Sequence, residues 1–357
     1  MKRRHLAICT AALLSFPAGA APAADPPGTL QIKPFPLPLS NQLSLEAKTI
    51  LTRQFAEQAP DFGSDIKAAR AFYGKFNDNR LAEMRAVFST YEQHATMGGV
   101  GVDIVTPTSG VSARNRDRVL INVHGGAFMW GSGSGELVEA IPIAATAGMK
   151  VVTVDYRLAP EHHYPAASQD VAAVYAELLK QYPPQNIGIY GCSAGGIITG
   201  QAIGWFHAHH LPKPGAIGSF CGTGAPYGGD SVFLAGPLTN AKPMVPGTAL
   251  PDTLPVSYMS GVPASDTEAY PVMSDAVLAR FPPTLLLAGG RDFAASTMTT
   301  THRRLARLGV PSELFLFDGL PHAFFMWPTM PESREAYRLI ADFFDHHLGT
   351  TARKGRL

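Results

Sequence analysis

The sequence predicts an α/β fold, in which a mostly parallel central sheet is flanked by helices and covered by a helical cap. From about residue 100 onward, short β-branched runs alternate with helical patterns. Such alternation, with nearly continuous apolar strands, is typical of a parallel sheet that is covered on both faces. Between about residues 43 and 91, apolar residues recur at helical spacing. Helices with wide apolar faces must bury them, so we expect this segment to pack over the main domain.

The first 24 residues have the pattern of a secretory signal peptide. Basic residues 2–4 precede a short apolar stretch, residues 6–16, and small-residue cleavage patterns follow within residues 18–23. The apolar stretch is too short to span a membrane. We therefore expect an exported protein, periplasmic or secreted, without stable membrane insertion after cleavage. An uncleaved anchor is the alternative.

Composition fits one large domain with a smaller accessory part, since the chain has 357 residues, 46% of them hydrophobic. Removing residues 1–24 leaves 26 Lys and Arg against 28 Asp and Glu, a formal net charge of −2. A near-neutral chain without a basic run lacks the electrostatic footprint of nucleic-acid binding. Cys192 and Cys221 lie in apolar stretches, which favours buried free thiols over a disulfide and indicates no metal site.

Residues 25–99 form a proline-rich lead-in and then the helical cap segment, with a break between two helices expected at Asn77-Asp78. The catalytic domain is expected over 100–350. Its predicted strands are Val100–Thr106, Arg118–Val123, Lys150–Asp155, Asn186–Tyr190, Ala216–Cys221, Thr284–Ala288 and Glu313–Phe317. Its predicted helices are Gly135–Ala147, Ala166–Gln181, Ala194–His209, Ser296–Leu308 and Glu332–Leu348. Residues 225–275 are rich in Gly and Pro and are interpreted as an insertion that completes the cap.

The strongest local signal is Gly191-Cys192-Ser193-Ala194-Gly195-Gly196, which ends a predicted strand and opens a predicted helix. This G-x-S-x-G pattern is typical of a sharp strand-to-helix turn that holds the serine exposed, and glycine is needed because side chains would clash there. The helix N-terminus also places backbone N–H groups near developing negative charge. We therefore predict Ser193 as a nucleophile.

A second glycine turn, His124-Gly125-Gly126, follows the predicted strand that ends at Val123. Without a Cβ, Gly125 and Gly126 can turn their N–H groups toward one point, and with the N–H of Ala194 they could form an oxyanion hole. His124 precedes the turn directly, and we interpret it as a structural residue rather than a base.

Asp292 and His322 each lie just past a predicted strand, in Gly290-Arg291-Asp292 and in Pro321-His322-Ala323. In open α/β sheets, ligand sites cluster at the carboxyl ends of the strands. The chain order is Ser193, Asp292, His322, which is the order expected for nucleophile, acid and base on this kind of sheet. The block 155–167 is interpreted as structural, with Arg157 pairing with Asp155, and Asp170 as structural too.

Residues from about 100 to 348 resemble the hormone-sensitive-lipase-like family of α/β-hydrolases. The resemblance rests on His124-Gly125-Gly126, Asp155–Glu161 with Tyr164–Ala167, Gly191–Gly196, Asp292 and His322. It implies the α/β-hydrolase fold, a triad of Ser193, His322 and Asp292, and oxyanion donors at Gly125, Gly126 and Ala194. It also implies a cap built from the N-terminal segment and an insertion after the sixth strand.

The expected activity is that of a serine carboxylesterase, which cleaves a small-molecule ester of short to medium chain length through an acyl-enzyme on Ser193. No cofactor or metal is required. Phe128 and Phe324 adjoin the catalytic motifs and are candidates for the substrate pocket. Two alternatives stay open: an amidase, arylformamidase, lactonase or peptidase on the same triad, and a non-catalytic ligand-binding relative.

Overall fold

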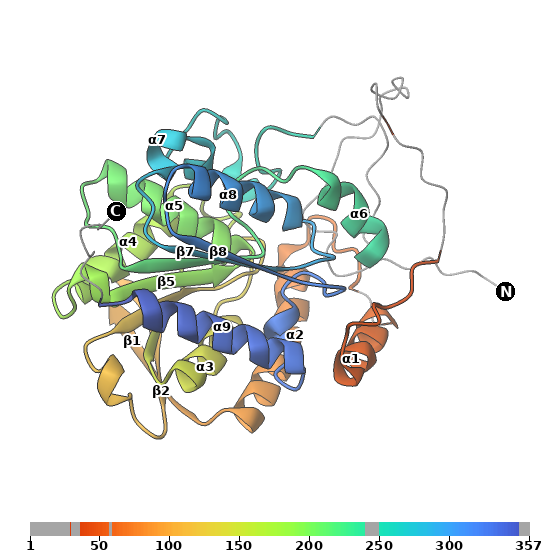
Figure 1. The fold of residues 1–357 in the computed structure, drawn as a ribbon, viewed down its shortest axis with the longest axis horizontal. Coiled ribbons are helices and arrows are strands. Elements are labelled where there is room, and N and C mark those ends of the chain that lie inside the picture. Colours follow the sequence, from red (N-terminus) through yellow and green to blue (C-terminus); the bar gives the residue numbers. More distant parts are fainter. Residues whose placement is uncertain (1–28, 30–35, 57–58, 240–249, 350–357) are drawn as a thin grey trace.

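The structure is a computed structural model that describes residue 29 and residues 36–56, 59–239 and 250–349 (Figure 1). The predicted signal peptide, residues 1–24, and most of the proline-rich lead-in lie outside the described residues. Among the described residues, no helix is both long and apolar enough to cross a membrane.

An eight-stranded sheet forms the centre, in the order β1-β2-β4-β3-β5-β6-β7-β8. The β1–β2 and β2–β4 pairs are antiparallel, and all other neighbours are parallel. The strands are β1 Thr90–Met97, β2 Val100–Pro107, β3 Val119–Val123, β4 Lys150–Val154, β5 Ile187–Cys192, β6 Ala216–Phe220, β7 Thr284–Gly289 and β8 Ser312–Phe317. The seven strands predicted from the sequence are thus confirmed to within about two residues, and β1 is additional.

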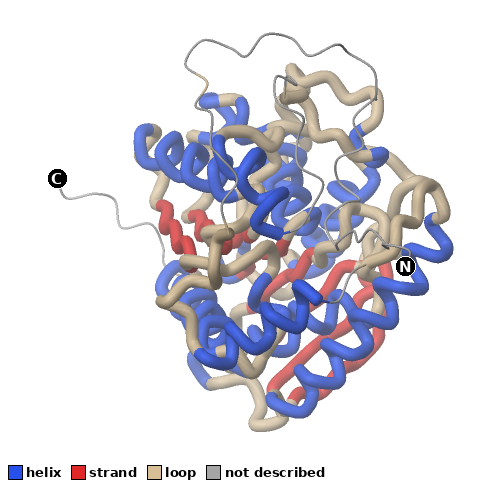
Figure 2. Tube along the Cα trace, turned by 90° about the vertical axis from the view of Figure 1, so that its right-hand side faces the viewer, coloured by secondary structure: helices blue, strands red, loops and turns tan. Residues whose placement is uncertain are grey.

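Helices cover both faces of this sheet (Figures 1 and 2). On one face lie α3 Ser134–Ala147 and α9 Pro331–His347, and on the other lie α4 Ala166–Leu178, α5 Ala194–Ala208 and α8 Ala295–Arg307. Successive strand side chains alternate between the faces, so that Leu120 belongs to the first core and Ile121 to the second. Both side chains are fully buried, which explains why the strands are apolar throughout.

The N-terminal segment differs from the prediction in two ways. It holds α1 Leu45–Ala56 and α2 Ile66–Val87, and α2 continues through the break expected at Asn77-Asp78. The helix begins instead after Asp65, whose side chain caps the N–H of Ala68 at 2.9 Å. The segment then ends in β1, an edge strand that pairs with β2, so the sheet begins at residue 90 rather than 100.

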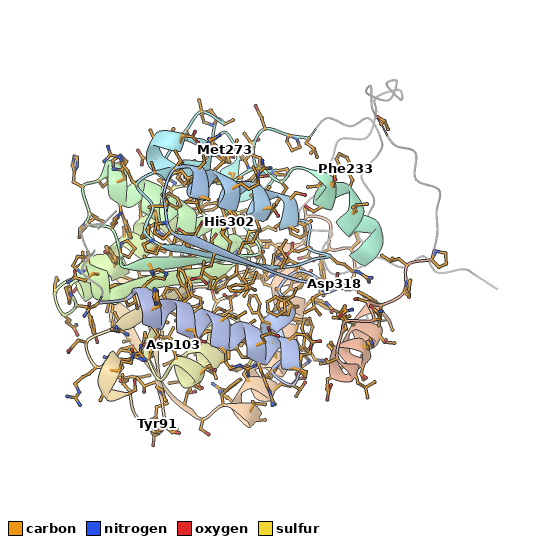
Figure 3. All side chains as sticks on the ribbon, viewed as in Figure 1. Tyr91, Asp103, Phe233, Met273, His302 and Asp318 are labelled. Carbon is orange, nitrogen blue, oxygen red and sulfur yellow. The ribbon has the colours of Figure 1, made fainter. Side chains whose placement is uncertain are left out.

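Within residues 225–275, the described part holds α6 Asp230–Thr239 and the short 3-10 turns Ser257–Met259 and Pro271–Met273, and α7 Asp275–Leu278 follows. Phe233 on α6 lies at the surface and is 43% exposed (Figure 3). Tyr258 and Tyr270, in contrast, are buried in the core beside α4 and α5. The part of this segment after residue 250 therefore packs against the main domain.

His124, directly after β3, is a fully buried histidine with a structural position. Its ring stacks on Tyr156 with centroids 4.3 Å apart, and its Nδ1 lies 2.7 Å from the carbonyl oxygen of Gly125. Burial lowers the pKa of His124 from 6.5 to about 4, because the charged imidazolium is poorly solvated there.

This low pKa predicts a loss of stability in acid. The unfolded chain takes up a proton at His124 near pH 6.5 and the folded chain only near pH 4, so the contribution of His124, on the order of 3 kcal/mol, is present above pH 6.5 and is lost as the pH falls toward 4. His124→Asn should flatten the fall of Tm between pH 6.5 and 4, measured by circular dichroism. His162→Gln, at an exposed histidine, should leave the wild-type slope. Equal slopes in all three proteins would contradict the assignment.

Candidate active site

A cavity of about 180 Å³ opens at the carboxyl ends of the parallel strands. Figure 2 views the molecule from this side. Its walls come from α1 and α2 and from the loops that follow β3, β5, β7 and β8. The residues that line it include Gln54, Phe55, Tyr73, Phe76, Gly125, Gly126, Ala127, Trp130, Glu139, Ser193, Phe293, His322 and Trp327. Helices and loops far apart in the sequence thus meet around one small space.

Ser193 stands at the turn between β5 and α5 and lines this cavity. Its backbone has φ +58° and ψ −120°, a conformation that costs energy for any residue with a side chain. The turn is held because the Ser193 N–H donates to the carbonyl oxygen of Phe220 at 2.8 Å. At Gly195, an added Cβ would lie 1.8 Å from the carbonyl oxygen of Val123, so only glycine lets the two loops approach this closely.

His322 and Asp292 form a hydrogen-bonded pair beside the same cavity. The Nδ1 atom of His322 lies 2.9 Å from Oδ1 and 3.0 Å from Oδ2 of Asp292. The Asp292 carboxylate is fully buried and also accepts the Ala294 N–H at 2.9 Å. Phe293 stacks on the imidazole with ring centroids 4.5 Å apart. With Nδ1 engaged, Nε2 is the ring nitrogen left for chemistry in the cavity. The structure thus brings together all three predicted triad residues.

The glycine turn after β3 corrects one predicted oxyanion donor. The N–H of Gly125 donates to Oε1 of Glu139 at 2.8 Å and is therefore not available to an oxyanion, so the prediction of Gly125 as a donor is wrong. Gly126, with φ +118°, and Ala127, with φ +53°, both line the cavity. Ala194 begins α5, where the N–H groups of the first turn lack helical partners. The candidate donors are therefore Gly126, Ala127 and Ala194. Within the turn after β3, the glycine signal alone does not identify Ala127 as a donor.

The predicted pocket residues Phe128 and Phe324 do not line the cavity. Phe128 is buried and stacks on Tyr258 with centroids 4.7 Å apart, and Phe324 is fully buried in the core beside α9. The aromatic wall is instead formed by Phe55, Tyr73, Phe76, Trp130, Phe293 and Trp327. Within it, Tyr73 and Trp130 stack at 4.2 Å, which fixes α2 against the loop after β3.

The loop after β4 is held by a different ion pair from the predicted one. Arg157 pairs with Asp170 at 2.9 Å rather than with Asp155, which is exposed. The structural role predicted for Asp170 is confirmed, because its Oδ2 also accepts the Arg157 N–H at 2.8 Å. Arg70 on α2 donates to the carbonyl oxygen of Ala159 in the same loop at 2.9 Å and to that of Met129 in the loop after β3 at 2.8 Å.

Among the described residues, Cys221, Asp292 and His322 offer ligand atoms within 4.8 Å of one another. Burial raises the pKa of the Cys221 thiol, so this sulfur is held as a poorly ligating thiol. The histidine and the carboxylate are already bonded to each other. The trio therefore fits a hydrogen-bonded acid–base pair better than a metal site. Cys192 and Cys221 are both free and buried, as predicted.

Comparison with known proteins places these residues in a family. Residues 120–326 match the model of a family with the α/β-hydrolase fold. A putative acetyl-hydrolase (LipR) of Mycobacterium tuberculosis is 36% identical over 39% of this chain, which spans 44% of that protein. An acetyl-hydrolase of Streptomyces hygroscopicus is 27% identical over 65% of this chain and 76% of its own length.

Solved structures agree with this match. A crystal structure of esterase E25 superimposes with a TM-score of 0.76 at 29% identity, over 90% of this chain and 99% of that one. An esterase of the bacterial hormone-sensitive lipase family shares the fold, with a TM-score of 0.71 at 24% identity, over 86% of this chain and 99% of that one. The chain belongs to the α/β-hydrolase family, and its fold is that of the hormone-sensitive-lipase-like members, as its motifs predicted.

Proposed function

We propose that this protein cleaves short- to medium-chain carboxylic esters through an acyl-enzyme on Ser193. The observation that carries the proposal is the meeting of Ser193 and the His322–Asp292 pair at one small, largely aromatic cavity. The reaction class agrees with the relatives, which are named esterases and acetyl-hydrolases. The chain is a serine carboxylesterase, and its substrate is a small-molecule ester.

The geometry supports two-step acyl transfer. The Oγ atom of Ser193 attacks the ester carbonyl while Nε2 of His322 takes its proton, and Asp292 holds the imidazole in the required tautomer and stabilises the imidazolium. The N–H groups of Gly126, Ala127 and Ala194 stabilise the negative charge on the tetrahedral oxygen. His322 then protonates the leaving alcohol. Water, activated by the same histidine, attacks the acyl-enzyme and releases the acid.

Substrate size follows from the walls of the cavity. Bulky rings from α1 and α2 close a space of about 180 Å³. Apolar walls favour an acyl chain, since each buried methylene contributes about 0.8 kcal/mol. A closed aromatic wall also limits how many methylenes fit. This supports short- to medium-chain acids over long-chain lipids.

We also propose that the protein is exported to the periplasm or the medium. The support is the basic start at residues 2–4 and the apolar stretch 6–16, both outside the described residues. N-terminal sequencing of protein recovered from cell fractions tests this. Mature chains that begin near residue 25 in the exported fraction would support export, and full-length chains retained in the cytoplasm would contradict it.

Replacement of the triad residues should abolish hydrolysis of p-nitrophenyl butyrate. For Ser193→Ala and His322→Ala we expect kcat to fall by about four orders of magnitude or more, because nucleophile and base act as a unit. Asp292→Asn should cost about as much, because the imidazole then adopts the wrong tautomer. Ser260→Ala, at an exposed serine, is the control and should keep wild-type kcat. More than a tenth of the activity surviving in Ser193→Ala would assign the nucleophile elsewhere.

Shortening one aromatic wall should change the chain-length preference. Phe76 lines the cavity and packs edge-on against Trp327 with centroids 6.5 Å apart. In Phe76→Ala the added space should raise the ratio of kcat/KM for octanoate over butyrate by about tenfold, as more methylenes are buried. Phe72→Ala is the matched control, because Phe72 lies on the same helix and packs on Phe62 outside the cavity. An unchanged ratio in Phe76→Ala would mean that the acyl chain lies elsewhere.

A further inference from the structure

Glu139 on α3 is a partly buried carboxylate that borders the cavity and has no part in the acyl transfer described above. Its Oε1 accepts the Gly125 N–H at 2.8 Å. Its Oε2 accepts the Cys192 N–H and the Asn122 side-chain amide, both at 3.3 Å. One side chain is thus bonded to three donors, one in each of the neighbouring strands β3 and β5 and one in the loop after β3.

The two backbone donors stand at matching places. Gly125 precedes Gly126 and Ala127, and Cys192 precedes Ser193 and Ala194. A hydrogen bond from an N–H fixes the plane of its peptide, and each plane sets the direction from which the next residue begins. The Glu139 carboxylate therefore orients both segments that carry the candidate oxyanion donors, one from each side.

Removing a carboxylate from water in order to bond two N–H groups costs free energy. Burial raises the pKa of Glu139 to about 7, and the bonds from Gly125, Asn122 and Cys192 act in the opposite direction. An apolar side chain would spare this desolvation but would leave both backbone N–H groups unpaired in the interior. A carboxylate supplies one oxygen to each, and such charge-assisted bonds are the stronger kind.

We infer that Glu139 is a positioning residue, which joins the loop after β3 to the nucleophile turn after β5 and so keeps the oxyanion N–H groups convergent. This inference rests on the proposed function. The oxyanion exists only in the transition state and the tetrahedral intermediate, whereas the ester carbonyl binds weakly beforehand. A misdirected donor should therefore lower kcat and leave KM nearly unchanged.

The test compares Glu139→Gln with Glu136→Gln in the full chain. Glu136 is also buried on α3 and its pKa is also raised to about 7, but its Oε1 accepts the Gly133 N–H at 2.7 Å and it does not line the cavity. Glutamine keeps the shape but offers a single acceptor oxygen, so one of the two loops is released. We expect kcat on p-nitrophenyl butyrate to fall about 10- to 100-fold in Glu139→Gln. KM should stay within about twofold, and Glu136→Gln should keep wild-type kcat.

Hydrogen–deuterium exchange of the same proteins measures how firmly the two segments are held, and it does not depend on turnover. In Glu139→Gln, peptides covering 124–127 and 191–194 should exchange faster than in the wild type, while in Glu136→Gln they should be unchanged. A folded Glu139→Gln with wild-type kcat, or with unaltered exchange in both peptides, overturns the inference, as does an equal loss of kcat in the two variants. A wild type inert on esters would refute the proposed function instead, and the exchange data would still decide whether Glu139 joins the two loops.

Discussion

The site depends on the parallel pairing of β3 with β5. Their register places Val123 opposite Gly191, so the two strands end at the same level and the two loops that follow them begin side by side. One loop supplies Gly126 and Ala127, and the other supplies Ser193. The loops can meet because Gly195 has no Cβ to strike the Val123 carbonyl oxygen. Any slip of this register would separate the nucleophile from the oxyanion donors. The His322–Asp292 pair would then no longer face both of them.

The cap is fastened to the same edge by bonds that do not involve the triad. Ser44, before α1, donates its N–H and its hydroxyl to the two carboxylate oxygens of Glu332 at 2.7 and 2.8 Å. Arg70 on α2 spans to Met129 and Ala159, next to the glycine turn. The helices that form the aromatic wall are thus tied to the loops that carry the chemistry. Cavity size and catalytic geometry are therefore parts of one packing arrangement.

The chemistry-bearing motifs were readable from sequence because each combines residue type with position at a strand end. Ser193, Asp292 and His322 were found this way, and the parallel sheet follows from apolar runs. The edge strand β1 was missed because it is polar and half exposed along its length, so no apolar run marks it. Asn77 looked like a helix break, yet it lies inside α2 and is buried.

Side-chain partners were harder to predict than positions. Phe128 adjoins the glycine turn in sequence, but its φ of +64° belongs to a turn that directs the ring toward Tyr258 in the core. The N–H of Gly125 is taken by Glu139, fourteen residues ahead on another element. No local pattern predicts either contact, because each joins the loop after β3 to a separate element, the turn Ser257–Met259 for Phe128 and α3 for Gly125.

Several energetically unfavourable features of the molecule lie together at one edge of the sheet. Ser193, Ala127 and Phe128 have backbones with positive φ, and the nearby His124 and Glu139 are ionisable side chains, the first fully buried and the second partly buried. Strain and buried polar groups lower stability, so they persist only where the surrounding packing holds them. Here that packing is the pair of apolar cores on either face of the sheet, which is rigid because both faces of every central strand are covered. A preorganised oxyanion hole needs this rigidity, since donors that must move into place at the moment of reaction stabilise the transition state less.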